Sequence, residues 1–208
     1  MGRGGNIKGV MGDKTHITTH LLERIFKPYL KDVVFLEVLD LIEQNSKGKI
    51  WLTGGYLYRN LAASLYGGEK YDYDIDFMVE QRNEVLKEIP GWEIEVNNYG
   101  IPNYVRTENR VSFTDIRKVT RVSGLRNHTI EEIIAGTPLN IQSIAYDLSE
   151  GRIIGKKGIE ALITGVVKIN SMAQAEFYAK KKGRDLEDII IEKAKELKFN
   201  CELPKKPA

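Results

Sequence analysis

The chain has 208 residues, with 31 Lys or Arg, 29 Asp or Glu and a formal net charge of +2. A hydrophobic fraction of 42% is typical of soluble globular proteins. This length suits one domain, or one domain with a short appendage, and excludes two full-sized independent domains. The near balance of charges neither indicates nor excludes nucleic acid as a partner, because binding depends on where the charge lies.

The chemistry of the rarer residues excludes several classes of site. Cys201 is the single cysteine, so the chain has neither an internal disulfide nor a Cys-rich zinc site, which fits a reducing, cytoplasmic environment. The three histidines, His16, His20 and His128, are not spaced as a metal cluster. No window approaches the roughly 18 uninterrupted apolar residues of a membrane span, so we expect no membrane association.

The first third of the chain alternates between helical and strand patterns. Residues 1–16 are Gly-rich and are expected to form a flexible arm, and the apolar spacing from Thr18 to Gln44 predicts two helices, with Pro28 in the first turn of the second. The segment KIWLT, residues 49–53, predicts a strand that ends at Gly54 and Gly55. Leucines at helical spacing then predict a helix that stops at the next glycine pair.

The remainder predicts one sheet and a helical tail. We expect a helix over residues 79–91 closed by Pro90, strands over 92–98 and 102–119, and a short helix over 129–136. Residues 140–158 indicate a strand or short helix that turns into a hairpin. The pattern therefore predicts an α+β domain over residues 17–170, with its mixed sheet flanked by helices and followed by a helical extension over residues 171–208.

The segment KYDYDIDFMVE, residues 70–80, carries an acidic face. Strand side chains alternate between faces, so Ile75 and Phe77 share an apolar stripe while Asp74 and Asp76 share the other face. Asp is depleted in strands and like charges on one face repel, which favours a functional reason for the pair. The alternative is the solvated face of an edge strand.

The Gly54–Gly55 turn and the acidic strand together predict a metal and phosphate site. Glycines between a strand and a helix let a phosphate approach the backbone and the positive helix N-terminus, although they also suit a plain tight turn. Asp74 and Asp76 follow on the next strand and offer the oxygen ligands that Mg²⁺ prefers. Such a site normally has a third carboxylate, for which Asp115 is the first candidate. Glu93 and Glu95 are the weaker alternatives to Asp115.

Three cations are candidates for neutralising a triphosphate. Arg59 lies on the helix that follows the glycines, and Arg117 and Lys118 come directly after Asp115. Guanidinium and ammonium groups bind phosphate oxygens through charge-assisted hydrogen bonds. Each of the three would be equally ordinary as a solvated surface charge.

The segments LTGGYLYRNL and DYDIDFMV resemble the nucleotidyltransferase superfamily of DNA polymerase beta, whose signature is a Gly-Gly or Gly-Ser turn followed by a D-x-D strand. The closer likeness is to the head domain of class II CCA-adding enzymes and bacterial poly(A) polymerases, and residues 140–170 are similar to a second segment of that family. The resemblance implies a polymerase-beta-like fold. It also implies that Asp74 and Asp76 bind metal and that Gly54 and Gly55 hold the triphosphate, and it places Asp115 and Arg117 near a second motif.

Several departures from the family concern the substrate. The family's R-R-D-F-T motif is replaced by EEIIAGTPLN, and its E-D-x-x-R helix has Ile191 where the arginine should be. The linker from Gly55 to Asp74 is longer than usual. The chain ends at Ala208, so we expect a minimal head without the parts that grip transfer RNA. CCA addition is therefore not carried over.

These observations lead to one hypothesis and two alternatives. The hypothesis is a nucleotidyltransferase that uses Mg²⁺ or Mn²⁺ to transfer a nucleoside monophosphate from a nucleoside triphosphate to an acceptor hydroxyl, with an RNA 3′ end as one candidate acceptor, and that releases pyrophosphate. The first alternative is an inactive nucleotide- or RNA-binding module of the same fold. The second is transfer to a small molecule or a protein side chain. The sequence does not give the acceptor, the preferred base or the oligomeric state.

Overall fold

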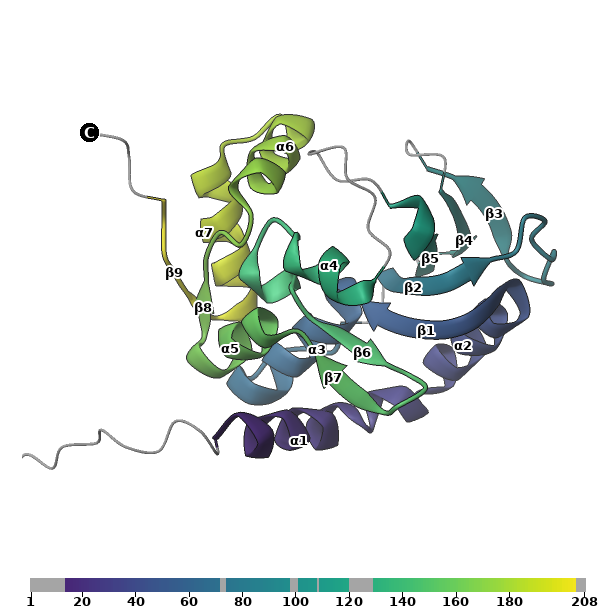
Figure 1. Cartoon of the computed structure of the whole chain (residues 1–208), viewed down its shortest axis with the longest axis horizontal. Helices are drawn as coiled ribbons and strands as arrows, with labels where there is room; N and C mark the ends of the chain where they lie inside the picture. Colours follow the sequence, from purple (N-terminus) through teal and green to yellow (C-terminus); the bar gives the residue numbers. More distant parts are fainter. Residues whose placement is uncertain (1–13, 72–73, 98–100, 108, 120–128, 205–208) are drawn as a thin grey trace, which may run out of the picture.

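The computed structural model describes residues 14–71, 74–97, 101–107, 109–119 and 129–204, and is shown in Figure 1. Its centre is a seven-stranded sheet in the order β3-β4-β5-β2-β1-β6-β7. The strands are β1 Ser46–Thr53, β2 Asp74–Arg82, β3 Glu93–Val96, β4 Pro102–Arg106, β5 Asn109–Asp115, β6 Ala145–Asp147 and β7 Arg152–Ile154. The sheet is mixed, because β2 and β5 run parallel while the other neighbours are antiparallel.

Helices surround this sheet, as Figure 1 shows. They are α1 Lys14–Phe26, α2 Val33–Asn45, α3 Gly54–Tyr66, α4 Ile130–Ala135, α5 Lys156–Thr164, α6 Met172–Lys182 and α7 Leu186–Leu197. Short 3-10 turns are η1 Tyr29–Lys31, η2 Ile116–Lys118 and η3 Asn140–Gln142, and a small parallel pair joins β8 Val166–Val167 to β9 Asn200–Cys201. The expected α+β class with a mixed sheet flanked by helices is confirmed.

One face of the sheet forms the main core with α1, α2 and α3. Ile75, Phe77 and Val79 of β2 are buried there, as the alternation along this strand predicts. The Phe77 ring lies 6.1 Å from that of Phe35, near the N-terminus of α2. Because burying a side chain of this size stabilises the fold by about 1.5 to 3 kcal/mol, this stripe fixes which face of β2 points inward. The other face of β2 must then carry the aspartates.

The opposite face of the sheet is covered by α4. Thr129 begins this helix with a capping box, in which its hydroxyl accepts from the Glu132 N–H and the Glu132 carboxylate accepts from the Thr129 N–H. Its isoleucines pack on Trp51 of β1, with Met78 of β2 at the edge of the cluster. The start of β2, where Asp74 is exposed, lies beyond this cluster along the strand.

Residues 83–92 are not helical, so the expectation of a helix over 79–91 is wrong. Strand β2 continues to Arg82, and the following backbone is held by side chains. The Lys87 N–H donates to the Asn45 side-chain oxygen at 2.8 Å, and the Tyr104 hydroxyl donates to the Lys87 carbonyl at 2.6 Å. Val85 is 84% exposed, so the apolar positions do not form the single buried stripe that a helix requires.

The link between the first two helices also differs from expectation. Pro28 is the N-cap of the 3-10 turn η1 and does not lie in the first turn of the second helix. Helix α2 starts after Asp32, whose side chain accepts from the N–H groups of Val34 and Phe35. An aspartate cap satisfies the free N–H groups of a first turn, which explains why α2 begins here.

The C-terminal segment packs on the rest of the chain. Ile190, Ala194 and Leu197 of α7 belong to the main core cluster. Strand β9 pairs with β8, and the Phe199 ring lies 4.9 Å from that of Tyr66 at the end of α3.

Within the described ranges, the helices are all too short or too polar to span a bilayer. Most of the expected arm, together with Asp72 and Tyr73, lies outside the described residues.

Candidate active site

Asp74 and Asp76 lie on the same face at the start of β2, separated by the buried Ile75. Strand β1 runs antiparallel beside them, and its last residue, Thr53, pairs with Asp76. Because α3 begins directly after Thr53, this topology brings the helix N-terminus to the carboxylate pair. The two sequence signals, Gly-Gly and D-x-D, therefore meet in space.

Gly54 lies directly against the Asp76 carboxylate. Its φ of +70° is unfavourable for residues with a side chain. A Cβ atom built on Gly54 would be 2.2 Å from the Asp76 Oδ2 atom, which is far inside van der Waals contact. Glycine is thus required both by the backbone conformation and by the close approach to the carboxylate.

The first turn of α3 presents its backbone N–H groups beside Asp76. The Thr53 hydroxyl precedes this turn but donates to the Asp76 carbonyl at 3.2 Å. Thr53, at the N-cap position, makes no capping hydrogen bond with its side chain. Backbone N–H groups at a helix N-terminus and the positive end of the helix dipole attract an anion such as a phosphate.

The charge of Asp76 is poorly compensated. Burial raises the pKa of its carboxyl above the ordinary value, and the nearby charge of Asp74 raises it further. The hydroxyl of Ser112, which is hydrogen-bonded to the Asp76 Oδ1 atom, and the charge of Arg59 only partly oppose these effects. Two carboxylates at one place, one of them half-buried, form a donor set that suits a hard divalent cation. The residues present therefore fit Mg²⁺ or Mn²⁺.

Arg59 and Tyr71 form one wall of the site. The Arg59 Cζ atom lies 4.1 Å from the centroid of the Tyr71 ring, and its Nη1 atom lies 3.2 Å from the position that a Cβ on Gly55 would occupy. The Tyr71 hydroxyl donates to the Asp74 Oδ2 atom at 3.2 Å. Burial is the main reason that the pKa of Tyr71 rises to about 12, so this hydroxyl stays protonated as a donor at neutral pH.

Asp115 does not join the carboxylate pair, contrary to the expectation for a third metal ligand. It lies two residues after the buried Phe113 and four after the buried Val111, so it points to the same core face of the sheet. Its strand position pairs with Val79, which is about 10 Å along β2 from Asp76 at the usual rise per residue. The structure thus separates Asp115 from the pair both by face and by distance.

The Asp115 carboxylate is instead occupied by arginine donors. It accepts from the Arg117 backbone N–H at 3.0 Å, from the Arg117 Nη2 at 2.7 Å and from the Arg82 N–H at 3.2 Å. Although burial opposes ionisation, these hydrogen bonds hold the pKa of Asp115 below its ordinary value. Arg117 is therefore paired, and both Arg117 and Lys118 lie in η2, past the far end of β5 from Gly54 and Gly55.

The strand position beside Asp76 is occupied by Ser112. Across the sheet the row continues from Ser112 to Asn103 and then to Glu95 on the outer strand β3. Glu95 forms an ion pair with Arg110 at 3.3 Å, and Glu93 is exposed two residues earlier. In the described portion of the chain, no three acidic, His or Cys side chains gather closely enough to hold a metal. The polar side chain beside the pair Asp74 and Asp76 is therefore the hydroxyl of Ser112, which is hydrogen-bonded to Asp76.

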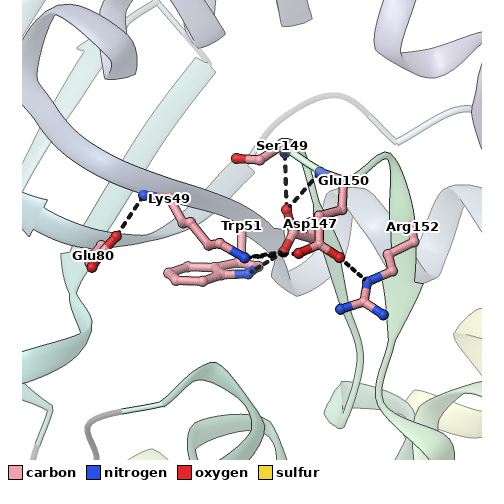
Figure 2. Close-up of polar contacts among 7 residues, drawn as sticks. All are labelled: Lys49, Trp51, Glu80, Asp147, Ser149, Glu150 and Arg152. Atoms are coloured by element: carbon pink, nitrogen blue, oxygen red, sulfur yellow. Dashed lines mark hydrogen bonds and ion pairs between the residues drawn. The ribbon is translucent and has the colours of Figure 1, made fainter.

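Asp147, a second buried carboxylate, lies on the neighbouring hairpin β6–β7 and has a structural role (Figure 2). It is 3% exposed and accepts from the Trp51 Nε1 at 3.2 Å and from the N–H groups of Ser149 and Glu150 at 3.0 Å. Lys49 lies 3.7 Å from it and also binds the Glu150 carboxylate. These donors stabilise the turn of the hairpin and balance the charge of Asp147.

Sequence reasoning missed the contributions of Ser112 and Tyr71 to the site. The alternation along β5 does place Ser112 on the face opposite to Phe113, but only the parallel register with β2 shows that Ser112 neighbours Asp76. Tyr71 precedes the acidic strand, and its sequence position alone does not assign it to the site. Its contacts with Arg59 and Asp74 depend on how α3 packs against β2, which local periodicity does not determine.

Comparison with solved structures supports the fold. The Bacillus stearothermophilus CCA-adding enzyme in complex with CTP matches 82% of this chain at 18% identity with a TM-score of 0.56. A tRNA-processing enzyme matches 74% at 14% identity with a TM-score of 0.50. These likenesses show that the chain has the nucleotidyltransferase-like fold seen in CCA-adding enzyme head domains.

The match covers only part of these larger proteins. The chain spans 41% of the first structure and 40% of the second, which is about two fifths of their length. No protein-family model and no curated protein sequence matches the chain. Fold and site geometry, and not sequence identity, are therefore the basis for assigning a function.

Proposed function

We propose that this protein is a metal-dependent nucleotidyltransferase that transfers a nucleoside monophosphate from a nucleoside triphosphate to an acceptor hydroxyl and releases pyrophosphate. The observation that carries the proposal is the contact between Gly54 at the start of α3 and the carboxylate of Asp76. It brings a helix N-terminus, which can bind an anion, beside a carboxylate pair, which can bind a cation. A metal–triphosphate needs both.

Asp74 and Asp76 are the proposed ligands of Mg²⁺ or Mn²⁺. When bound, such an ion supplies Lewis-acid polarisation of the phosphoryl group and lowers the pKa of the acceptor hydroxyl. The carboxylates hold the cation, and the hydrogen bond from Ser112 fixes the orientation of the Asp76 carboxylate. Tyr71 does the same for Asp74 through its hydroxyl.

The triphosphate is proposed to lie across the first turn of α3. Backbone N–H groups at Gly54 and Gly55 would donate to the outgoing phosphates, which carry the growing negative charge as pyrophosphate leaves. Arg59 would add a charge-assisted hydrogen bond from its position above Gly55. Arg117 and Lys118, which lie at the far end of β5, are not assigned to this step.

We propose that the acceptor is a hydroxyl such as an RNA 3′ end, and that the protein acts in the cytoplasm. The CCA-adding enzyme that the chain resembles in fold was solved with CTP, so a ribonucleoside triphosphate is the first donor to test. Transfer to a small molecule or a protein side chain would use the same donor site. The acceptor therefore has to be identified experimentally.

The test is a labelling assay with purified protein, Mg²⁺ or Mn²⁺ and each of the four α-labelled nucleoside triphosphates. Total RNA is added in one set of reactions and omitted in another. The proposal predicts label in RNA with one or more of the triphosphates, lost in Asp74→Asn and Asp76→Asn. The matched control is Asp40→Asn, an exposed aspartate on α2.

Three other outcomes would revise the proposal. Label on the protein alone would indicate side-chain modification. Metal-dependent nucleotide binding without any transfer, even with small-molecule hydroxyl acceptors added, would favour an inactive binding module. Transfer that survives in the double variant Asp74→Asn/Asp76→Asn would contradict the assignment of the site.

A further inference from the structure

Glu196 of α7 reaches the candidate active site from the C-terminal segment. Its Oε1 atom forms an ion pair with the Arg59 Nε, and its Oε2 atom forms one with Lys193 on the same helix. The side chains are sheltered, with 24% of Arg59, 34% of Glu196 and 15% of Lys193 exposed. Glu196 thus bridges two cations beside the first turn of α3.

The ion pair uses a particular edge of the guanidinium. Glu196 binds Nε, on the stem side, while Nη1 lies above Gly55 and the flat face stacks on Tyr71. An arginine presents its donors as a rigid planar fork, so fixing one edge and one face fixes the direction of the remaining donors. Here the Nη1 end of the fork points to the helix N-terminus.

Lys193 holds the carboxylate in turn. Its Nζ atom pairs with Glu196 and lies 5.7 Å from the centroid of the buried Tyr58 ring, which follows Gly55 on α3. Lys193 and Glu196 lie on adjacent turns of α7, whose apolar residues Ile190, Ala194 and Leu197 are anchored in the main core. The position of Glu196 is therefore set by the packing of α7 on α3.

We propose that Glu196 is a positioning residue of the nucleotidyl-transfer site, which holds Arg59 in the orientation that receives the triphosphate. This inference rests on the proposed function. It makes α7 part of the donor site and gives the C-terminal segment a role beyond stability. Without this partner, the Arg59 side chain would sample other rotamers. Ordering it when the triphosphate binds would then cost conformational entropy and weaken binding.

The competing explanation is that Glu196 occupies Arg59 in place of the triphosphate and so weakens binding. The geometry favours positioning, because the ion pair is at Nε whereas the Gly55 backbone is approached by Nη1. The two explanations predict opposite signs. Loss of the carboxylate should weaken triphosphate binding if Glu196 positions Arg59, and should tighten it if Glu196 competes.

The experiment measures steady-state transfer and equilibrium binding of each Mg²⁺–nucleoside triphosphate for the full chain and its variants. We expect Glu196→Gln to raise KM for the triphosphate by about threefold to fivefold, with a smaller change in kcat, which is the scale of one partly sheltered ion pair. Glu196→Asp should recover part of the loss because it restores the charge. The matched control is Glu192→Gln, one turn earlier on α7, where the carboxylate pairs with Arg184 instead.

A double-mutant cycle separates positioning from a merely structural role. In an Arg59→Ala background, Glu196→Gln should have no further effect on KM, whereas a general loss of stability would persist. Thermal unfolding of every variant provides the second readout, and we expect Glu196→Gln and Glu192→Gln to have similar midpoints.

The outcomes distinguish this inference from the function on which it rests. A wild-type chain that neither binds nor turns over any triphosphate would overturn both. Wild-type binding that is unchanged or tightened by Glu196→Gln, or an effect of equal size with and without Arg59, would overturn the positioning role alone.

Discussion

Replacing Gly54 by alanine tests the closest contact of the candidate site. The added Cβ would lie 2.2 Å from the Asp76 Oδ2 and 2.9 Å from its Cγ. Ordinary carbon–oxygen contact begins near 3.4 Å, so the carboxylate or the helix start must move by about 1 Å. A misplacement of this size can lower a catalytic rate by about 100-fold.

The same substitution also strains the backbone, and this part can be measured separately. Alanine at a φ of +70° costs roughly 1 to 2 kcal/mol of folding free energy. Gly183, which ends α6, has a φ of +62° and open space where a Cβ would lie. Gly183→Ala therefore carries the backbone strain without the collision.

The assay compares nucleotidyl transfer and denaturant unfolding for both variants. We expect Gly54→Ala to lose more unfolding free energy than Gly183→Ala, because the collision adds to the backbone strain. We also expect a drop in kcat/KM of about 100-fold for Gly54→Ala with little change for Gly183→Ala. Near wild-type transfer by Gly54→Ala would refute the reasoning. An equal loss of transfer in both variants would refute it too, because the effect would then follow from instability.

Three further substitutions probe the electrostatics of the site. The folded-state pKa of Asp76 is raised, so its carboxyl contributes stability below the ordinary Asp pKa of 3.8, and this stability is lost as pH rises through the folded value. Without divalent metal, Asp76→Asn should therefore raise the free energy of unfolding near neutral pH but not at about pH 3. Asp115→Asn should do the reverse. Its lowered pKa gives stability above the ordinary value that is lost as pH falls through the folded one, so we expect destabilisation by about 2 kcal/mol at pH 7, seen by urea unfolding, with transfer kinetics preserved. Tyr71→Phe removes the hydrogen bond to Asp74 but keeps the ring beneath Arg59. In a metal titration it should raise the Mg²⁺ concentration for half-maximal transfer severalfold, while triphosphate binding at saturating metal stays unchanged.

The parts of the fold that sequence predicted are those governed by local periodicity. The two-residue alternation of β2 placed Ile75 and Phe77 in the core and the aspartates on the other face, as observed. The Gly54–Gly55 turn marked the boundary between β1 and α3 because glycine is needed at that φ. In each case the deciding physics acts within a few residues of the chain.

The parts that sequence could not predict depend on long-range packing. The segment after Arg82 has a helix-like pattern, but Asn45 and Tyr104 bind its backbone in a non-helical form. The alternation of β5 places Asp115 on the side of Phe113, but its distance from Asp76 along the sheet follows from the parallel register with β2. The register of a parallel pair is set by the whole sheet, and no short motif encodes it.

The most direct test of the central claim is equilibrium titration of a non-hydrolysable Mg²⁺–nucleoside triphosphate analogue into the wild-type chain and into Asp74→Asn/Asp76→Asn. If the carboxylate pair and the start of α3 form one metal–triphosphate site, wild-type binding will be saturable and will require the metal, and the double variant will lose it. Equal binding by both chains, or wild-type binding that persists when the metal is chelated, would contradict the account.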